Sequence, residues 1–218
     1  PTLMGPDTTV VTLQNGMGNA EEIARIIPAD RIYVGLCFIC AMREKPGHVN
    51  HLEGGNIQFA PFIPTPEGTE KARELSELFA NAGIKTRAFD AAEQIQWYKL
   101  VWNIPFNGLC LALGGISIAE LYQNPENVMR ARRIMEEVVQ AAKARGYALP
   151  EDLVEFHLSR TETMGAFIPS SAVDYNEGRP VEYTAIWGDP LSKARQAGAS
   201  VPEWELLDKA IRKRLNIN

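Results

Sequence analysis

Lys99, Asn103 and Asn107 are the residues whose types and spacing could do chemistry in this chain. They lie within residues 97–113, a segment that is otherwise almost wholly apolar. On a helix of about 3.6 residues per turn, positions four apart drift by only about 40°, so the ammonium and the two amides share one face. A lysine with a pKa lowered by partial burial can act as a general acid. The stripe therefore predicts an active site.

Two structural interpretations compete with this one. The Lys99 ammonium could extend to solvent from the end of a core helix, and the two asparagines could simply bond to neighbouring loops. Pro105 also interrupts the hydrogen-bond ladder of the expected helix, which predicts a kink between Asn103 and Asn107. Such a kink would shift the polar stripe without abolishing it.

The first part of the chain alternates strand and helix. Residues 9–14 have β-type composition, residues 20–27 are helical, and the apolar run 32–41 reads as a buried strand, which together predict a parallel βαβ unit. Short strands joined by a turn at 53–56 are expected next. They precede a helix that starts near Thr65 and Pro66 and stops at Gly83, and a last strand at 84–89. The expected buried face of that helix consists of Ala72, Leu75, Leu78, Phe79 and Ala82.

From about Asp90 onward every long segment has helical periodicity, so we place a domain boundary between residues 1–90 and 91–218. Asn124 as N-cap and Pro125 at the first helical position predict a helix that ends at Gly146. A further pair is expected over 182–197 and 202–215. The basic residues in 211–215 suit a helix C-terminus, where they complement the dipole.

The loop after the first strand, NGMGNAE at 15–21, is the nearest match to a glycine-rich dinucleotide fingerprint. It lacks the third glycine and a suitably placed acidic residue on a second strand, so the signal for a dinucleotide is weak. A functional loop at the end of a strand and a plain βα turn both remain open. The single βαβ unit also makes the first domain look incomplete for a doubly wound sheet.

Composition excludes several classes of function. A net charge of −5 over 218 residues, without a Lys/Arg cluster, does not indicate a nucleic-acid-binding surface. No apolar run is long enough to span a bilayer. No signal peptide is evident, so a cytoplasmic location is the default. Cys37 and Cys40 would point to opposite faces of a strand, and His48 and His51 are expected in a surface loop. We therefore predict no metal site.

Three blocks of sequence together resemble the ketopantoate reductases, also called 2-dehydropantoate 2-reductases. They are TLQNGMGN at 12–19, WYKLVWNIPFN at 97–107, and PSS at 169–171 with Asp174 and EGRPVE at 177–182. The resemblance covers most of the chain. It implies a partial Rossmann-type NADP-binding domain followed by an all-helical substrate domain, like the C-terminal domain of 6-phosphogluconate dehydrogenase. The implied activity is NADPH-dependent reduction of 2-dehydropantoate to pantoate, in the pathway to pantothenate and coenzyme A.

The resemblance also implies roles for individual residues. Lys99 would be the general acid that protonates the carbonyl oxygen as hydride arrives, and Asn103 and Asn107 would bind polar groups of the substrate. Hydride addition creates an alkoxide, which a positioned ammonium stabilises and then protonates, so the chemistry agrees with this assignment.

Three further residues take roles from the same resemblance. Glu182 would accept a hydrogen bond from the substrate hydroxyl, Ser170 would help to hold the carboxylate, and Asn15 would lie near the junction of nicotinamide and substrate. The choice of Ser170 over Ser171 depends on counting back from Asp174. Without the resemblance, Glu182 reads as an exposed acid in the first turn of a helix.

The glycine-rich phosphate loop of the family is absent from this sequence, so the chain looks like a fragment and is expected to bind NADPH poorly and to turn over little. The expected partners are a small 2-oxo acid and, from the resemblance, a second copy in a homodimer. Two alternatives stay open: a reductase of another 2-oxo acid on the same plan, and a non-catalytic helical assembly module that uses 97–113 as an interface.

Overall fold

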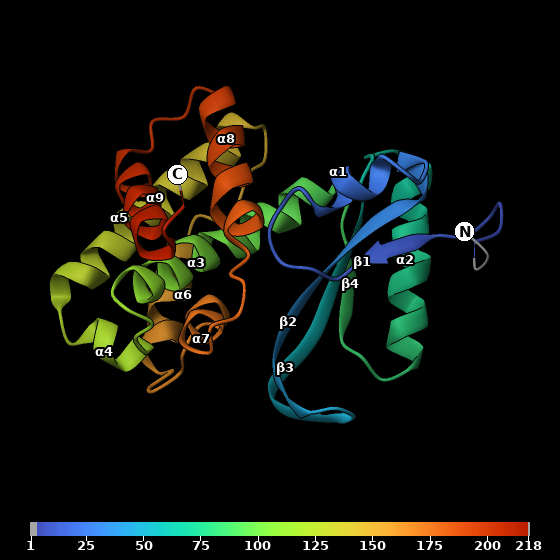
Figure 1. The fold of residues 1–218 in the computed structure, drawn as a ribbon. Coiled ribbons are helices and arrows are strands. Elements are labelled where there is room, and N and C mark those ends of the chain that lie inside the picture. The colour runs from blue at the N-terminus through green and yellow to red at the C-terminus, as the bar shows by residue number, and fades with distance from the viewer. Residues whose placement is uncertain (1–3, 218) are drawn as a thin grey trace. The chain divides into compact units, whose positions relative to one another are not determined.

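The computed structural model describes residues 4–217, apart from the side chains of Met42 and Glu53. The chain divides into two compact units, Pro1–Gln96 and Trp97–Asn218, which we call the first and the second unit. The first is built on a sheet and the second is entirely helical. This arrangement confirms the expected α/β region followed by an all-α region (Figure 1).

The first unit is a four-stranded mixed sheet with helices. Its elements are β1 (Val10–Thr12), α1 (Asn19–Ala24), η1 (Ala29–Arg31), β2 (Ile32–Lys45), β3 (His48–Pro61), α2 (Pro66–Asn81) and β4 (Thr86–Ala88). The strand order is β1-β2-β3-β4. β1 and β2 are parallel with α1 between them in sequence, which confirms the βαβ unit. β3 is antiparallel to β2 and parallel to β4.

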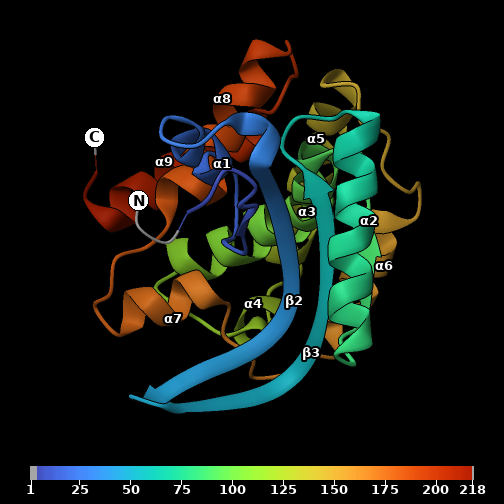
Figure 2. The same cartoon turned by 90° about the vertical axis from the view of Figure 1, so that its right-hand side faces the viewer.

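Side-chain alternation along β2 gives this sheet two buried faces. Val34 and Leu36 pack on one face with Ala20 of α1, whereas Tyr33 packs on the other face with Ala72 of α2. Figure 2 accordingly shows α1 and α2 on opposite sides of the ribbon formed by β2 and β3. α2 begins as expected, with the Thr65 hydroxyl accepting the Gly68 N–H at 3.0 Å.

The β2–β3 hairpin differs from the sequence expectation in three respects. The turn lies at residues 46–47, between β2 and β3, and not at 53–56, and the predicted loop with His48 and His51 is the start of β3. Gly54 has φ 79° inside β3 at a break in register, and a Cβ there would lie 2.4 Å from the Phe38 carbonyl oxygen. The glycine pair therefore marks a β-bulge, which has the same composition as a turn.

Burial along β2 is also less extensive than expected. β2 is buried only as far as Leu36, and Ile39 is exposed on the outer part of the hairpin. Leu78 of α2 is exposed as well, although the apolar pattern placed it on the buried face, and Ala82, predicted on the same face, is an exposed residue just after the end of the helix.

The second unit is an assembly of helices around α3 (Ala92–Ala112), which starts in the first unit. The others are α4 (Ile118–Tyr122), α5 (Pro125–Ala144), α6 (Leu153–Glu162), α7 (Ser170–Asn176), the π-helical turn η2 (Thr184–Gly188), α8 (Asp189–Gln196) and α9 (Pro202–Leu215). α5 starts at the predicted cap, since Asn124 Oδ1 accepts the Glu126 N–H at 3.0 Å. α9 has the predicted bounds. The helix expected over 182–197 is divided into η2 and α8.

Close packing fixes α3 against its neighbours in the second unit. Trp97 meets Trp204 of α9 edge to face, with 6.5 Å between ring centroids. A Cβ on Gly108 would lie 2.7 Å from Leu207 Cδ2 and 2.9 Å from Trp187 Nε1. Only glycine at 108 allows α9 and η2 to approach α3 this closely.

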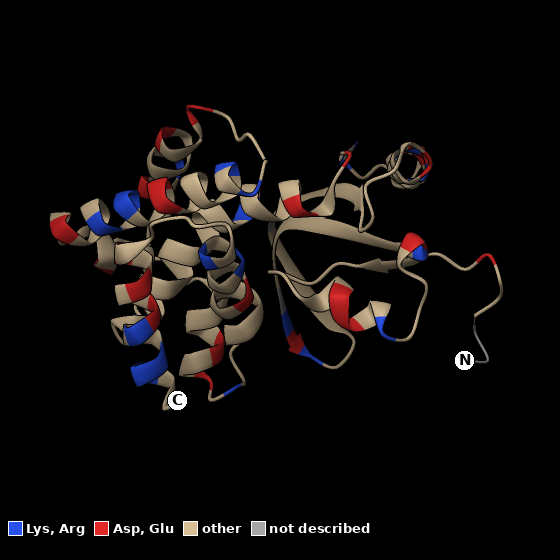
Figure 3. Ribbon diagram, turned by 90° about the horizontal axis from the view of Figure 1, so that it is seen from above, with Lys and Arg blue, Asp and Glu red and all other residues tan. Residues whose placement is uncertain are grey.

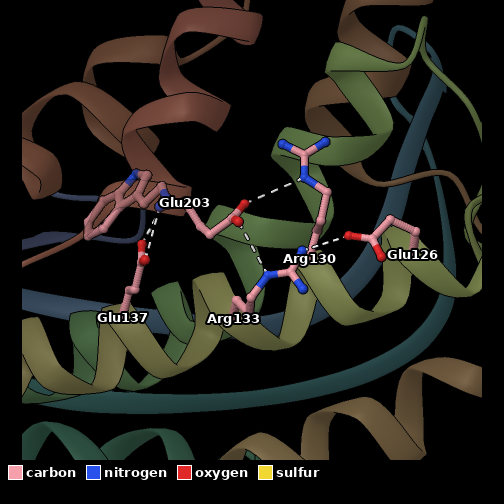
Figure 4. Close-up of polar contacts among 6 residues, drawn as sticks. Glu126, Arg130, Arg133, Glu137 and Glu203 are labelled. Carbon is pink, nitrogen blue, oxygen red and sulfur yellow. Dashed lines mark hydrogen bonds and ion pairs between the residues drawn. The ribbon is translucent and has the colours of Figure 1, made fainter.

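A carboxylate from α5 fixes the start of α9 (Figure 4). Glu137 accepts the backbone N–H groups of Glu203 at 2.9 Å and Trp204 at 2.8 Å. The Glu203 carboxylate lies 3.3 Å from Arg133 Nε and 3.7 Å from Arg130 Nε. A helix begins with N–H groups that lack intrahelical partners, and Glu137 supplies acceptors for two of them.

Charged residues of both signs are interspersed along the helices (Figure 3). Among the helices in residues 4–217, none combines the length and the apolar character needed to cross a bilayer.

Candidate active site

The predicted polar stripe lies on α3. Lys99 is half-buried, Asn103 is 6% exposed and Asn107 is 2% exposed. Pro105 lies inside the helix, which continues beyond it to Ala112. The neighbouring positions on α3 are apolar and buried, so the three polar groups are surrounded by hydrophobic side chains.

Asn107 has a structural task in addition to any contact with a ligand. Its Oδ1 accepts the backbone N–H of Ser171 at 3.1 Å and lies 3.4 Å from Ser170 Oγ. The amide oxygen thus supports the N-terminus of α7, where N–H groups need an acceptor. The structural interpretation of the stripe expected the asparagines to make such hydrogen bonds to neighbouring segments. It leaves the amide nitrogen of Asn107 as the group that a ligand could engage.

Asn103 differs from Asn107 in this respect. No other residue in the described part of the chain hydrogen-bonds its side chain. Buried side-chain amides in folded proteins almost always have partners, because an unsatisfied one costs free energy. Asn103 avoids this cost, because its amide atoms are not among the fully buried polar atoms without a partner and so keep access to solvent. One turn from a lysine, this amide is therefore available to a ligand.

The two serines at the start of α7 are distinguished by exposure. Ser170 is exposed and its hydroxyl is within 3.4 Å of Asn107 Oδ1. Ser171 is 2% exposed, and its backbone N–H is the one bound to Asn107. Of the two hydroxyls, that of Ser170 is the more accessible to a ligand.

Glu182 lies two residues before η2, and its electrostatics connect it to Lys99. Although the residue as a whole is exposed, partial desolvation raises the pKa of its carboxyl, the charge of Asp174 raises it further, and the Lys99 ammonium lowers it. Asp174 is itself paired with Arg179, whose Nε and Nη2 both lie 2.8 Å from its Oδ1. The second unit thus brings Lys99 into the electrostatic range of Glu182.

Sequence reasoning assigned no role to the residues that surround Glu182. Tyr183 and Trp187 stack on each other beside it, and the Tyr183 hydroxyl donates to Asp208 on α9 at 2.5 Å. The only sequence signal was two aromatic residues four positions apart, directly after the glutamate.

Asn15 lies in the first unit, in the loop after β1. Asn19 Nδ2 donates to its backbone carbonyl at 3.0 Å, and Gln96 Nε2 donates to the carbonyl of Gly16 at 3.0 Å. α1 follows with Gly18 as N-cap and no capping side chain. The loop is therefore fixed at the carboxyl end of a parallel strand, which is where ligands bind in α/β sheets. In the described residues, His, Cys, Asp and Glu side chains form no cluster of three suited to a metal ion.

Comparison with known proteins relates both units to one family. The family described as "Ketopantoate reductase PanE/ApbA C terminal" matches residues 91–214, and "Ketopantoate reductase PanE/ApbA" matches residues 1–64. A 2-dehydropantoate 2-reductase of Nostoc sp. is 35% identical over 206 residues, which are 93% of this chain and 64% of that protein. The chain thus spans somewhat less than two thirds of that relative.

Solved structures agree with the sequence comparison. The crystal structure of 2-dehydropantoate 2-reductase from Geobacter metallireducens has a TM-score of 0.88 and 37% identity, and the match covers 94% of this chain and 68% of that one. A complex of D-mandelate dehydrogenase with NADH has a TM-score of 0.85 and 25% identity, covering 100% of this chain and 74% of that one.

Proposed function

The chain belongs to the ketopantoate reductase family, and on that premise we propose that it carries the substrate site for NADPH-dependent reduction of 2-dehydropantoate to pantoate. The observation that supports this most directly is the pairing on α3 of Asn103, a nearly buried amide without a partner among the described residues, with half-buried Lys99. The Lys99 ammonium also lowers the pKa of the Glu182 carboxyl, which supports including this carboxylate in the proposed site.

Each group has a defined task in this proposal. The Lys99 ammonium donates a hydrogen bond to the ketone oxygen and delivers its proton as negative charge develops there. The Asn103 amide and the nitrogen of Asn107 bind polar atoms of the substrate, and the Ser170 hydroxyl binds its carboxylate. Glu182 accepts a hydrogen bond from the substrate hydroxyl.

The cofactor is part of the proposal as well. NADPH, when bound, would supply the hydride. The fixed loop that carries Asn15 at the end of β1 suits the nicotinamide end of a dinucleotide. In contrast, this sequence contains no complete G-x-G-x-x-G turn to hold the pyrophosphate.

Replacing Lys99 by alanine in the complete gene product tests the proposed catalytic role. We expect a normal fold and a loss of kcat of roughly a hundredfold or more, because the general acid is removed. Lys193→Ala on α8 is a matched control and should retain the wild-type rate. Circular dichroism and thermal unfolding check the fold, and NADPH oxidation measures the rate. A Lys99→Ala protein with an undiminished rate would contradict the proposal.

Two other functions give different results in the same experiments. A reductase of another 2-oxo acid, for which the likeness to D-mandelate dehydrogenase provides a specific reason, would reduce a different ketone faster than 2-dehydropantoate, so kcat/KM is measured for several 2-oxo acids. An assembly module would show altered folding or association on Lys99→Ala and no reductase activity.

A further inference from the structure

A hydrogen-bonded clamp holds the residue that follows Glu182. The Tyr183 hydroxyl donates to Asp208 Oδ1 at 2.5 Å, and Arg212 Nε donates to Asp208 Oδ2 at 3.1 Å. Asp208 is only 6% exposed, and the Arg212 guanidinium carbon lies 5.0 Å from the centroid of the Tyr183 ring. Both carboxylate oxygens are therefore engaged, and the charge is balanced by an adjacent cation.

A second connection joins the same tyrosine to α3. The Tyr183 ring stacks on Trp187, with 6.3 Å between centroids and 26° between planes. Trp187 is fully buried, and its indole N–H donates to the Ile104 carbonyl at 3.0 Å. Ile104 directly follows Asn103 on α3. Tyr183 is thus tied to α9 by its hydroxyl and to the Asn103 region by its ring.

The backbone between these anchors is a π-helical turn. η2 spans Thr184–Gly188, and the Glu182 carbonyl accepts the Ile186 N–H at 3.1 Å. π-helical turns are rare and are frequently found at functional sites. Residues 177–180 before Glu182 are exposed, and their connection to α7 is through Arg179, whose backbone N–H donates to the Asp174 carbonyl at 2.8 Å and whose guanidinium pairs with the Asp174 carboxylate. On the C-terminal side of Glu182, the backbone is held by the contacts of Tyr183.

We propose that Tyr183 and Asp208 are positioning residues that hold η2 so that the Glu182 carboxylate faces Lys99. Neither side chain is required to touch substrate, since each acts through the segment that carries Glu182. The inference rests on the proposed function for the role of Glu182. Its geometric part, the clamp that fixes this carboxylate, is tested without turnover.

The geometric test is a titration of Glu182 by ¹³C NMR of its side-chain carboxyl in the 218-residue chain. Tyr183→Phe removes only the hydroxyl, and Glu182→Gln identifies the resonance. Tyr122→Phe is the matched control, because the Tyr122 hydroxyl also makes one hydrogen bond, to the Leu158 carbonyl at 3.0 Å. We expect Tyr183→Phe to lower the Glu182 pKa measurably towards its ordinary value as the carboxyl gains solvent, and Tyr122→Phe to leave it unchanged.

The kinetic test uses Tyr183→Phe and Asp208→Asn in the complete gene product. We expect both to lower kcat roughly ten- to hundredfold, because a misplaced reacting group is costly, with a melting temperature near that of Tyr122→Phe. An unchanged Glu182 titration in Tyr183→Phe would overturn the clamp even if Lys99→Ala abolishes turnover. Conversely, a shifted titration in a protein whose Lys99→Ala variant retains its rate would support the clamp and refute the proposed function.

Discussion

A side-chain amide that keeps access to solvent and has no protein partner contributes little to the stability of the ligand-free chain, whereas one that accepts a backbone N–H contributes more. Asn103 and Asn107 provide a contrast at this scale. Both lie on one face of α3, but only the Asn107 oxygen is bound by the protein, at the start of α7. A substitution at each position should therefore have a different consequence.

Asn103→Ala is expected to leave the free energy of unfolding of the ligand-free chain almost unchanged, while weakening ligand binding about ten- to hundredfold. Asn107→Ala should instead lower the free energy of unfolding by about 1–3 kcal/mol, because the Ser171 N–H loses its acceptor. Urea unfolding and calorimetric titration with pantoate measure the two effects. A large destabilisation by Asn103→Ala would show that this amide is structural.

His157 predicts a dependence of stability on pH. Burial, and then the nearby Arg160 cation, lower its pKa to about 4, and its Nε2 has no hydrogen-bond partner among the described residues. The unfolded chain, with a histidine pKa of about 6.5, binds more protons between these values. Stability due to His157 is therefore complete above about pH 6.5 and falls towards pH 4, by at most about 3 kcal/mol.

Urea unfolding at pH 7 and at pH 4.5 measures this effect. His157→Leu should flatten the loss of stability on acidification, whereas His48→Gln, on the exposed hairpin, should keep it. If wild type and His157→Leu lose the same free energy of unfolding between pH 7 and pH 4.5, the prediction is refuted.

At the scale of elements, α9 depends on a side chain from α5. Glu137→Ala leaves the N–H groups of Glu203 and Trp204 without their acceptor, so we expect the free energy of unfolding to fall by about 1–3 kcal/mol. Glu136→Ala, an exposed neighbour on the same helix, should change it by less than about 0.5 kcal/mol. Chemical unfolding compares the variants, and equal losses would show that the cap contributes nothing.

Elements with local signals were predictable from the sequence, and those fixed by distant contacts were not. The starts of α5 and α9 could be predicted from Asn124 with Pro125 and from Pro202, because helix caps and apolar periodicity depend on residues close together in the sequence. The Gly54 bulge was mistaken for a turn, since both need a residue with positive φ. η2 could not be foreseen, because its anchors are on α3 and α9.

The same distinction applies to the candidate site. The stripe on α3 was visible as polar residues at a spacing of four in an apolar run. The commitment of the Asn107 oxygen to α7 and the clamp at Asp208 join residues more than 20 positions apart, with atoms within 3.1 Å. No local pattern encodes such contacts.

For the whole molecule, the 218-residue chain should bind NADPH only weakly. The first unit offers the loop after β1, but the sequence has no complete phosphate-binding turn, and phosphate groups contribute much of the affinity for dinucleotides. Fluorescence titration of the chain with NADPH measures this, with the complete gene product as comparison. Micromolar binding by the 218-residue chain would contradict the prediction.

Association of the whole molecule stays a prediction as well. A homodimer was expected from the family resemblance, and sedimentation equilibrium of the chain at several concentrations would determine its mass in solution.

The contact between Asn107 and α7 couples recognition to local order. If a ligand immobilises the Asn107 nitrogen, the oxygen of the same amide becomes a better anchor for the Ser171 N–H. Thermodynamic reciprocity makes this coupling mutual: a change that strengthens the hydrogen bond between Asn107 and α7 also favours ligand binding, and a change that weakens this bond disfavours it. Sequence variation along α7 after Ser170 can thus tune affinity without touching a single atom of the substrate.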